Sequence, residues 1–170
     1  KFTLKSPTIS THVIDPNVDE ARRYLFEDLA YSQAVARVMV EQGIKGRIIA
    51  VSSISAEFGG SQQAHYCASK AGINLLVKSM AISLGPHGIT CNAVLPGTVE
   101  TDINREALSD PEARDYWLKR GPIGGLGKPE DIAGPVLFFA SDDSAWCTGS
   151  VRVMTDVVFY EKPGCLSNAR

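Results

Sequence analysis

The alternation of apolar and polar stretches along the chain predicts helices and strands in turn. Apolar residues at helical spacing predict a helix over 19–42, and Gly43 follows it as a stop signal. An apolar run at 47–53 then predicts a short strand of a parallel sheet, because such a strand is covered on both faces. Two further helices and two further strands are predicted by the same patterns: helices over 64–84 and 129–140, strands over 89–95 and 151–154.

This order of helices and strands predicts an α/β fold with a parallel sheet and flanking helices. The α/β unit extends over 19–154. Residues 1–18 are polar and are predicted to form an irregular arm. Residues 155–170 are predicted to form a divergent C-terminal tail. Between the last two predicted strands, 98–118 reads as a loop and helical region, and 121–127 as a glycine-rich turn.

Composition and charge exclude several classes of partner. The chain has 170 residues, 44% hydrophobic and 21% charged, which suits one globular domain. A net charge of −2 gives no reason to expect nucleic acid or an anionic membrane as a partner. No apolar run approaches the roughly 20 residues that span a bilayer. Nucleic acid and membranes are therefore not predicted as partners.

The cysteines and histidines show neither a disulfide framework nor metal-ligand spacing. No Cys-x-x-Cys pair occurs, so reduced thiols and a cytoplasmic location are predicted, and no metal site. The residues concerned are Cys67, Cys91, Cys147, Cys165, His12, His65 and His87.

Tyr66 and Lys70 are the candidate chemical pair of this chain. They lie four residues apart in the helix predicted over 64–84, so their side chains share one helix face. A lysine ammonium beside a phenol favours the phenolate, which makes the tyrosine a usable proton acceptor near neutral pH. Ser53 lies 13 residues before Tyr66 at the end of a predicted strand, where its hydroxyl can hydrogen-bond the oxygen whose proton moves. This trio predicts proton transfer at an alcohol or carbonyl.

Several motifs, in order and with matching gaps, resemble the short-chain dehydrogenase/reductase family over roughly residues 33–150. They read Ser-Ser-Ile-Ser at 52–55, Tyr-Cys-Ala-Ser-Lys-Ala-Gly at 66–72, Asn-Ala-Val-Leu-Pro-Gly-Thr at 92–98, Gly-Lys-Pro-Glu-Asp at 127–131 and Thr-Gly at 148–149. Within the family, the stretch 95–104 is most similar to sugar dehydrogenases, L-rhamnose 1-dehydrogenases among them. The resemblance implies an NAD- or NADP-dependent oxidoreductase acting on the CH–OH group of a sugar or secondary alcohol.

The resemblance also implies a role for each residue of the trio. Tyr66 would be the general acid/base, and Ser53 would orient and polarise the substrate oxygen. Lys70 would support Tyr66 and hydrogen-bond the nicotinamide ribose. The site would lie at the carboxyl ends of the strands. The residues implied to contact the cofactor are Tyr66, Lys70, Pro96, Gly97, Thr98, Val99 and Thr101.

The chain departs from the family pattern towards both ends. The family's Gly-x-x-x-Gly-x-Gly loop does not precede residue 33. That spacing occurs only at Gly121, Gly125 and Gly127, where no strand leads into it, so we reject it as a phosphate loop. The family's catalytic Asn would fall near Tyr24. We therefore expect a partial Rossmann-like sheet, the catalytic half of the family's domain, without the N-terminal nucleotide-binding half.

Two hypotheses about function remain open from the sequence. The first is an NAD(P)-dependent dehydrogenase. The second is a non-catalytic remnant that keeps the trio but acts only as an interaction or structural subunit, with weak or no activity alone. The resemblance further implies a homodimer or homotetramer, assembled through the helices predicted near 19–42 and 64–84.

Overall fold

The computed structural model describes residues 18–59, 63–120 and 123–154. The expected arm, except Val18, and the expected tail lie outside these residues, as do Cys165 and His12. The main elements within them are α1 (Val18–Glu41), β1 (Arg47–Val51), α2 (Ala64–Leu84), β2 (Thr90–Pro96), α3 (Pro111–Arg120), α4 (Pro129–Ala140) and β3 (Val151–Met154). Short 3-10 turns join them: η1 (Ile54–Ala56), η2 (Gly85–His87), η3 (Asp102–Asn104), η4 (Ala107–Ser109) and η5 (Asp142–Ser144).

The predicted α/β fold with a parallel sheet is confirmed. The three strands pair in the order β1-β2-β3, all parallel, with Val51 beside Val94 and Pro96 beside Met154. The predicted bounds of α2, α4 and β3 match the observed ones, and α1 and β2 are displaced by one residue. Strand β1 ends at Val51, two residues earlier than expected, because Ser53 leaves the strand to cap the turn η1.

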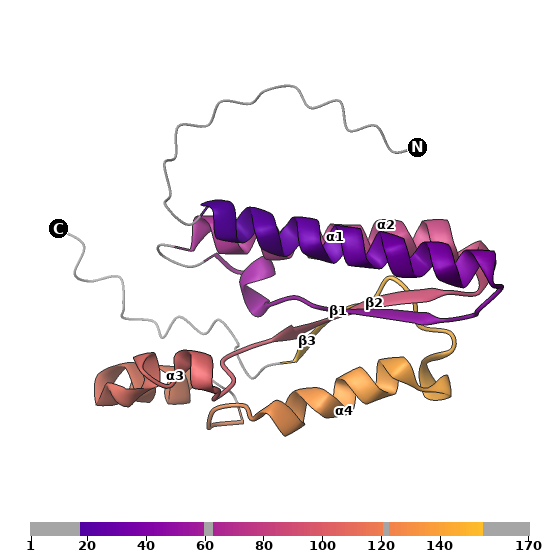
Figure 1. Ribbon diagram of the computed structural model, residues 1–170. Coiled ribbons are helices and arrows are strands. Elements are labelled where there is room, and N and C mark those ends of the chain that lie inside the picture. The colour runs from indigo at the N-terminus through magenta and orange to yellow at the C-terminus, as the bar shows by residue number, and fades with distance from the viewer. Residues whose placement is uncertain (1–17, 60–62, 121–122, 155–170) are drawn as a thin grey trace.

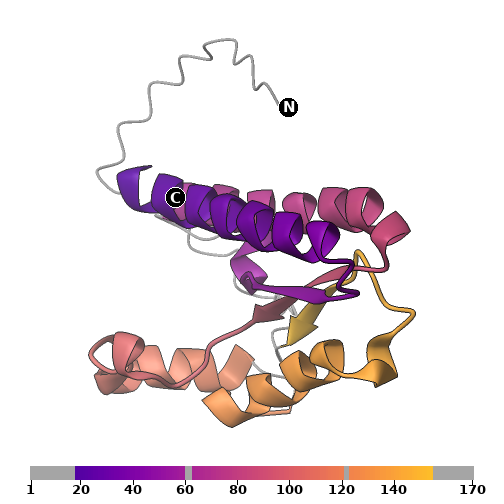
Figure 2. The same ribbon diagram turned by 45° about the vertical axis from the view of Figure 1, so that its right-hand side comes forward.

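The elements form three layers (Figures 1 and 2). Helices α1 and α2 lie side by side over one face of the sheet, and α4 covers the other face. The chain leaves the carboxyl end of β2 and reaches α3, which lies beyond the end of the strands (Figure 1). This arrangement leaves the carboxyl ends of β1 and β2 as the edge at which the site residues gather.

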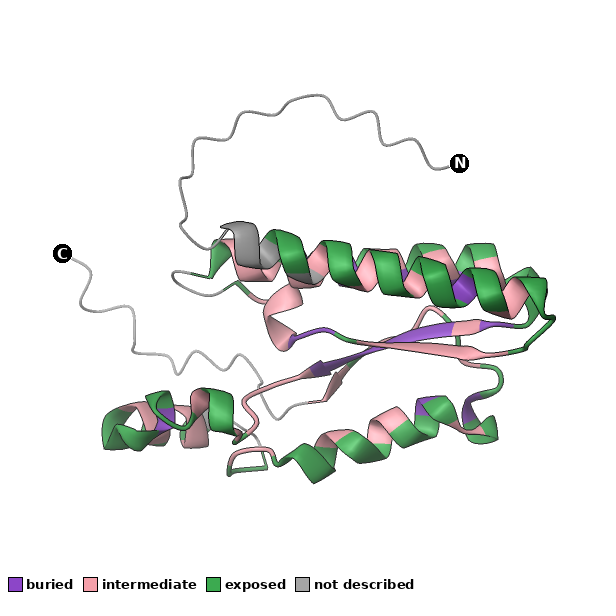
Figure 3. Cartoon of the chain, viewed as in Figure 1, coloured by how far each residue is buried: buried purple, intermediate pink, exposed green. Residues whose placement is uncertain are grey.

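The core lies between α2 and the central strand. Three α2 residues one turn apart, Ile73, Val77 and Ala81, form a stripe that packs against alternate β2 residues. Those β2 residues, Cys91, Ala93 and Leu95, are fully buried, and β2 is the most buried strand in Figure 3. Burying each large aliphatic side chain of this kind contributes about 1.5–3 kcal/mol.

Cys91 belongs to this core as an apolar residue. Its burial raises the pKa of the thiol to about 11, so the group stays neutral near physiological pH. Cys67 and Cys147 also carry free thiols.

Asn92 ties β2 to the segment that leads into β3. It is fully buried, its Nδ2 donates to the Cys147 carbonyl at 2.9 Å, and its Oδ1 accepts from the Ser150 N–H at 3.1 Å. Both side-chain polar groups are therefore satisfied by backbone, as a buried amide requires. Asn92 has a structural role and lies outside the candidate site.

Among residues 18–59, 63–120 and 123–154, no strand pairs with the outer edge of β1, which is called its open edge below. The Ser52 N–H donates to the Val94 carbonyl and the Thr90 N–H donates to the Gly46 carbonyl, so the even-numbered residues of this segment face β2. Since N–H and C=O of one residue point the same way in a parallel strand, those of Arg47, Ile49 and Val51 face away from the sheet. The Val51 carbonyl at this edge is used by a site residue, described next.

Candidate active site

The three predicted site residues come from two neighbouring segments at one end of the sheet. Ser53 follows β1 directly, while Tyr66 and Lys70 lie in the first two turns of α2. The turn η1, which Ser53 caps, packs against α2, and this contact brings the strand end and the helix together. The fold therefore places the segments that carry the trio next to each other, and the roles of the three residues stay predictions.

Ser53 is held rigidly at the strand end. Its side chain is buried, with 8% of its surface exposed, and its Oγ accepts a hydrogen bond from the Ser55 N–H at 3.1 Å. The cap uses one acceptor site of the hydroxyl and leaves its O–H free to donate. This arrangement suits a donor that polarises a substrate oxygen.

Tyr66 and Lys70 face each other across one helical turn. The Lys70 Nζ lies 5.8 Å from the centroid of the Tyr66 ring and donates a hydrogen bond to the Val51 carbonyl at 3.1 Å. The ammonium thus lies between the open edge of β1 and the aromatic ring. At this distance from the ring, its charge acts favourably on the π-system.

Burial and a carboxylate act in opposite directions on Lys70. Burial lowers the pKa of the Lys70 ammonium, because a low-dielectric environment disfavours its charge, and the negative charge of Asp28 on α1 partly opposes this. Burial also raises the pKa of the Asp28 carboxyl. The positive charge of Lys70 lowers this pKa, and the negative charge of the neighbouring Glu27 raises it.

Two serines that sequence analysis did not assign to the site bond to the backbone of the site residues: Ser52 ties α2 to the end of β1, and Ser69 bonds within α2. The Ser52 Oγ donates to the Lys70 carbonyl at 3.1 Å, and the Ser69 Oγ donates to the Tyr66 carbonyl at 2.8 Å. Both serines are buried. The pair of serines at 52–53 was the sequence signal that could have indicated the role of Ser52, because two adjacent hydroxyls at a strand end can bond to two different partners.

The segment expected to line the nicotinamide follows β2 at the same edge. Pro96 is the last residue of β2, and Gly97, Thr98 and Val99 follow it half-buried. Gly127 pairs with this segment: its N–H donates to the Thr98 carbonyl at 3.0 Å, and its carbonyl accepts from the Glu100 N–H at 2.8 Å. These two backbone hydrogen bonds of Gly127 therefore hold the loop that follows β2 in place.

The backbone N–H and the side chain of Thr101 both take part in a local turn. Its N–H donates to the Asn104 Oδ1 at 2.9 Å, and its Oγ1 lies 3.3 Å from the same oxygen. The Asn104 Nδ2 donates to the Val99 carbonyl at 2.7 Å. Thr101 therefore starts η3 as its capping residue, and its predicted contact with the cofactor stays a prediction.

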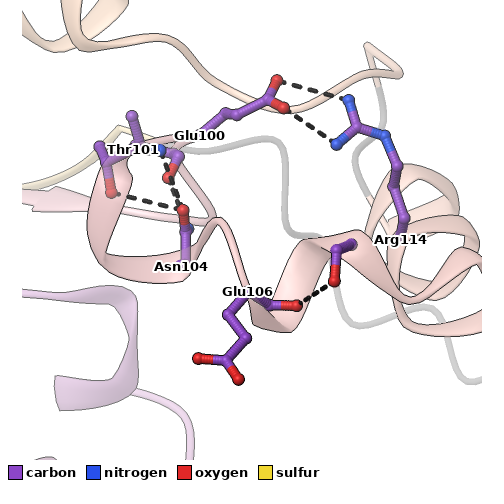
Figure 4. A network of polar contacts seen from close by, with 7 residues as sticks. Glu100, Thr101, Asn104, Glu106 and Arg114 are labelled. Atoms are coloured by element: carbon purple, nitrogen blue, oxygen red, sulfur yellow. Dashed lines mark hydrogen bonds and ion pairs between the residues drawn. The ribbon is translucent and has the colours of Figure 1, made fainter.

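A polar network joins this loop to α3 (Figure 4). The Arg114 guanidinium donates to both carboxylate oxygens of Glu100, at 2.9 and 3.4 Å, and lowers the pKa of the Glu100 carboxyl through these bonds and its charge. The Ser109 Oγ donates to the Glu106 carbonyl at 2.6 Å. The network fixes the path of the chain from β2 to α3.

The donor chemistry of the site fits one end of a dinucleotide. A ribose presents hydroxyl acceptors, and the Lys70 ammonium and Tyr66 hydroxyl both donate at the strand ends, where open α/β sheets bind ligands. Among residues 18–59, 63–120 and 123–154, no group of three His, Cys, Asp or Glu residues lies close enough together to hold a metal ion. Within the same ranges, no helix has the length and apolar character needed to cross a membrane.

A parallel α/β sheet with a Ser, a Tyr and a Lys at its carboxyl edge defines the class of dinucleotide-dependent dehydrogenases. Residues 28–156 match the family model described as enoyl-(acyl carrier protein) reductase. The chain belongs to the short-chain dehydrogenase/reductase family.

The curated relatives include sugar dehydrogenases. An L-rhamnose 1-dehydrogenase (NAD(P)(+)) of Azotobacter vinelandii is 58% identical over 127 residues, covering 75% of this chain and 50% of the relative. An L-rhamnose 1-dehydrogenase (NADP(+)) of Thermoplasma acidophilum is 47% identical over 119 residues, covering 70% and 47%. The chain thus spans about half the length of the curated relatives it matches.

Solved structures of the same family share the fold. A 4-hydroxyisoleucine dehydrogenase complexed with NADH superposes with a TM-score of 0.81 at 27% identity, covering 86% of this chain and 60% of the other. A gluconate 5-dehydrogenase from Burkholderia cenocepacia, in complex with NADP and tartrate, gives a TM-score of 0.76 at 30% identity, covering 83% and 56%.

Proposed function

We propose that this chain carries the catalytic residues of an NAD(P)-dependent sugar dehydrogenase that oxidises the anomeric hydroxyl of an aldose, L-rhamnose first among them, to a lactone. The observation that carries the proposal is the meeting of Ser53, Tyr66 and Lys70 at the carboxyl edge of the sheet, with the Lys70 ammonium 5.8 Å from the Tyr66 ring centroid. The likeness to L-rhamnose 1-dehydrogenases supports the choice of substrate.

The proton transfer follows from the positions of the three side chains. The Ser53 O–H donates to the substrate oxygen and holds it in place. Tyr66 acts as the general base that accepts the proton of the substrate hydroxyl, and the positive charge of the nearby Lys70 ammonium favours this transfer. The C–H bond on the same carbon gives up its two electrons with the hydrogen, and a carbonyl forms. The same groups return the proton when the reaction runs in reverse.

The nicotinamide, when bound, supplies the acceptor for that hydride. Lys70 and Tyr66 would hold the ribose by hydrogen bonds, and Pro96, Gly97, Thr98 and Val99 would line the nicotinamide. Half-burial of 96–99 and its bracing by Gly127 support this use, since a fixed surface lowers the entropic cost of orienting the ring.

The assay for this proposal mixes the purified protein with L-rhamnose and either NAD or NADP, and follows the absorbance of the reduced nicotinamide. We expect reduction of at least one cofactor with L-rhamnose and none with L-rhamnitol, which lacks the anomeric carbon. Chromatography should then identify the lactone.

Absence of cofactor reduction, together with absence of NAD or NADP binding by calorimetry, would overturn the proposal. That outcome would favour the second hypothesis, a non-catalytic interaction subunit. The feature that favours this alternative is the edge of β1 with which no strand pairs in the described part of the chain.

We also propose that the protein assembles through the outer faces of α1 and α2. On α1, Tyr31, Val35 and Val38 recur at helical spacing and are exposed by 45–71%. On α2, Leu75 and Ile82 are exposed by 66% and 80% on the side away from the sheet. Two adjacent apolar stripes suit a two-fold contact with a second copy.

Replacing Val35 by Glu is expected to dissociate this assembly, because it places a charge within the apolar contact. Light scattering coupled to size-exclusion chromatography measures the mass. Ile123→Glu, which alters a loop residue that is 90% exposed, serves as the matched control and should keep the native mass. A wild-type monomer, or a Val35→Glu variant that retains the assembly, would contradict the proposal.

A further inference from the structure

Ser52 carries a buried hydroxyl that the pairing of the strands does not require. Its backbone N–H donates to the Val94 carbonyl at 2.8 Å, and any residue with an N–H could form this bond to β2. Ser52 has only 4% of its surface exposed, and its Oγ donates to the Lys70 carbonyl at 3.1 Å. Since burying a hydroxyl is costly unless it is bonded, the side chain at this position serves the contact with α2.

The end of β1 bonds to Lys70 at two points. The Val51 carbonyl accepts from the Lys70 Nζ at 3.1 Å, and the Ser52 hydroxyl donates to the backbone carbonyl of the same lysine, also at 3.1 Å. Two successive residues of the strand end thus hold the backbone and the tip of one lysine. A lysine has a flexible four-carbon stem, so fixing its backbone beside the strand limits the positions that its ammonium can reach.

The hydrogen bond from Ser52 also fixes the helix relative to the strand. Ser53 follows Ser52 directly, with about 3.8 Å between successive Cα atoms, and Tyr66 lies about one helical turn before Lys70. A short path therefore leads from the Ser53 hydroxyl to Tyr66, through the strand end, this hydrogen bond and one turn of helix. Loss of the bond would allow Ser53 and Tyr66 to shift relative to each other.

Ser69 provides a contrast within the same helix. It is as buried as Ser52, with 4% of its surface exposed, and its Oγ donates to the Tyr66 carbonyl at 2.8 Å. Both residues of this bond belong to α2, so the bond joins no second element. Replacing either serine by Ala removes the same atom from an equally buried position, but only the change at Ser52 separates the helix from the strand.

We propose that Ser52 is a positioning residue, which holds Lys70 and Tyr66 in place relative to the Ser53 hydroxyl so that the three side chains meet at one substrate oxygen. Its role in turnover rests on the proposed function. The Lys70 carbonyl takes the single hydroxyl proton of Ser52, so Ser52 acts through Lys70 rather than on the substrate. Such precision matters because a displacement of about 1 Å at a catalytic group can cost about 10²-fold in rate.

The first test follows the Lys70 ammonium by NMR and needs no activity. The full chain is labelled with ¹⁵N-lysine, and the Lys70 Nζ signal is assigned by its loss in Lys70→Arg. The exchange of its protons with water is measured in the cold at mildly acidic pH. We expect Ser52→Ala to speed this exchange, because the ammonium then leaves the Val51 carbonyl more often. Ser69→Ala should keep the wild-type rate.

An unchanged exchange rate in Ser52→Ala, or an equal increase in Ser69→Ala, would overturn the inference. Circular dichroism checks the folding of each variant. Helix α2 should stay intact, because a helical carbonyl such as that of Lys70 also accepts the N–H four residues later. If Ser52→Ala does not fold, Ser52→Cys takes its place: its thiol is a weaker donor, so a smaller increase is expected, and an unchanged rate would refute the role of the hydroxyl.

Turnover gives a second and separable readout. Ser52→Ala should lower kcat about tenfold and leave KM for L-rhamnose within about threefold, because misplacement of Tyr66 and Lys70 affects the chemical step rather than sugar binding. Ser141→Ala removes a hydroxyl that bonds to the Phe138 carbonyl at 2.9 Å at the end of α4, and it should keep the wild-type kcat.

A kcat of Ser52→Ala within about twofold of wild type, or an equal loss in Ser141→Ala, would overturn the role of Ser52 in turnover. A rise in KM with unchanged kcat would also contradict it, because that result indicates lost substrate binding. If the wild-type protein does not turn over, the proposed function fails, while the exchange of the Lys70 ammonium still decides whether Ser52 positions this lysine.

Discussion

Tyr66→Phe is expected to lower kcat by a factor of about 10²–10⁴ while weakening the binding of NAD or NADP much less, by at most about tenfold, as for the loss of one hydrogen bond. The substitution removes only the phenolic oxygen, and general acid–base catalysis is worth roughly the factor expected for kcat. The ring remains beside the Lys70 ammonium, and Lys70 keeps its hydrogen bond to the Val51 carbonyl. Steady-state kinetics with the sugar and calorimetric titration of the cofactor measure the two quantities separately.

Tyr116→Phe is the matched control for this prediction. It removes the same hydroxyl from a tyrosine that is 53% exposed on α3, and kcat should stay at the wild-type value. Turnover by Tyr66→Phe within about threefold of wild type would refute the assignment of Tyr66 as the acid/base, because a loss that small lies well below the usual contribution of such a group.

Ile73→Ala is expected to lower the free energy of unfolding by about 2–5 kcal/mol. Ile73 has no exposed surface and packs in the stripe that joins α2 to β2. Its truncation removes buried methyl and methylene groups and leaves a cavity under the helix that carries Tyr66 and Lys70. Urea denaturation followed by circular dichroism gives the change.

Ile103→Ala removes the same atoms from a side chain that is 97% exposed in η3. Its effect on unfolding should stay within about 0.5 kcal/mol, as for other surface substitutions. Equal destabilisation by the two variants would show that the Ile73 stripe is not the core of the molecule.

The secondary structure could be predicted because its signals are local. Apolar spacing and the Gly85-Pro86 stop predicted α2 with its observed bounds. Pro129 with two acidic residues predicted the start of α4, where the Lys128 N–H donates to the Asp131 carboxylate at 2.7 Å. The end of β1 was predicted two residues late, because the capping of η1 by Ser53 competes with continuation of the strand.

The candidate site was only partly visible in the sequence. The four-residue spacing of Tyr66 and Lys70 guarantees a shared helix face, so their contact follows from helix geometry alone. Ser52 could not be assigned in this way, since its partner is a backbone carbonyl 18 residues later. Asp28 carries no motif, and its charge acts on Lys70 from a different helix, so no local pattern indicates this effect.

Periodicity and motif spacing were thus sufficient for the α/β class, the parallel sheet and the identity of Ser53, Tyr66 and Lys70 as candidates, because these depend on residues a few positions apart. Tertiary packing alone decided how the site is supported. It determines the burial of Lys70, the hydrogen bond from Lys70 to the Val51 carbonyl, the hydrogen bond from Ser52 to the Lys70 carbonyl, and the effect of the Asp28 charge on Lys70. Such contacts join segments distant in the chain, and their formation depends on how helices and strands pack rather than on any local pattern.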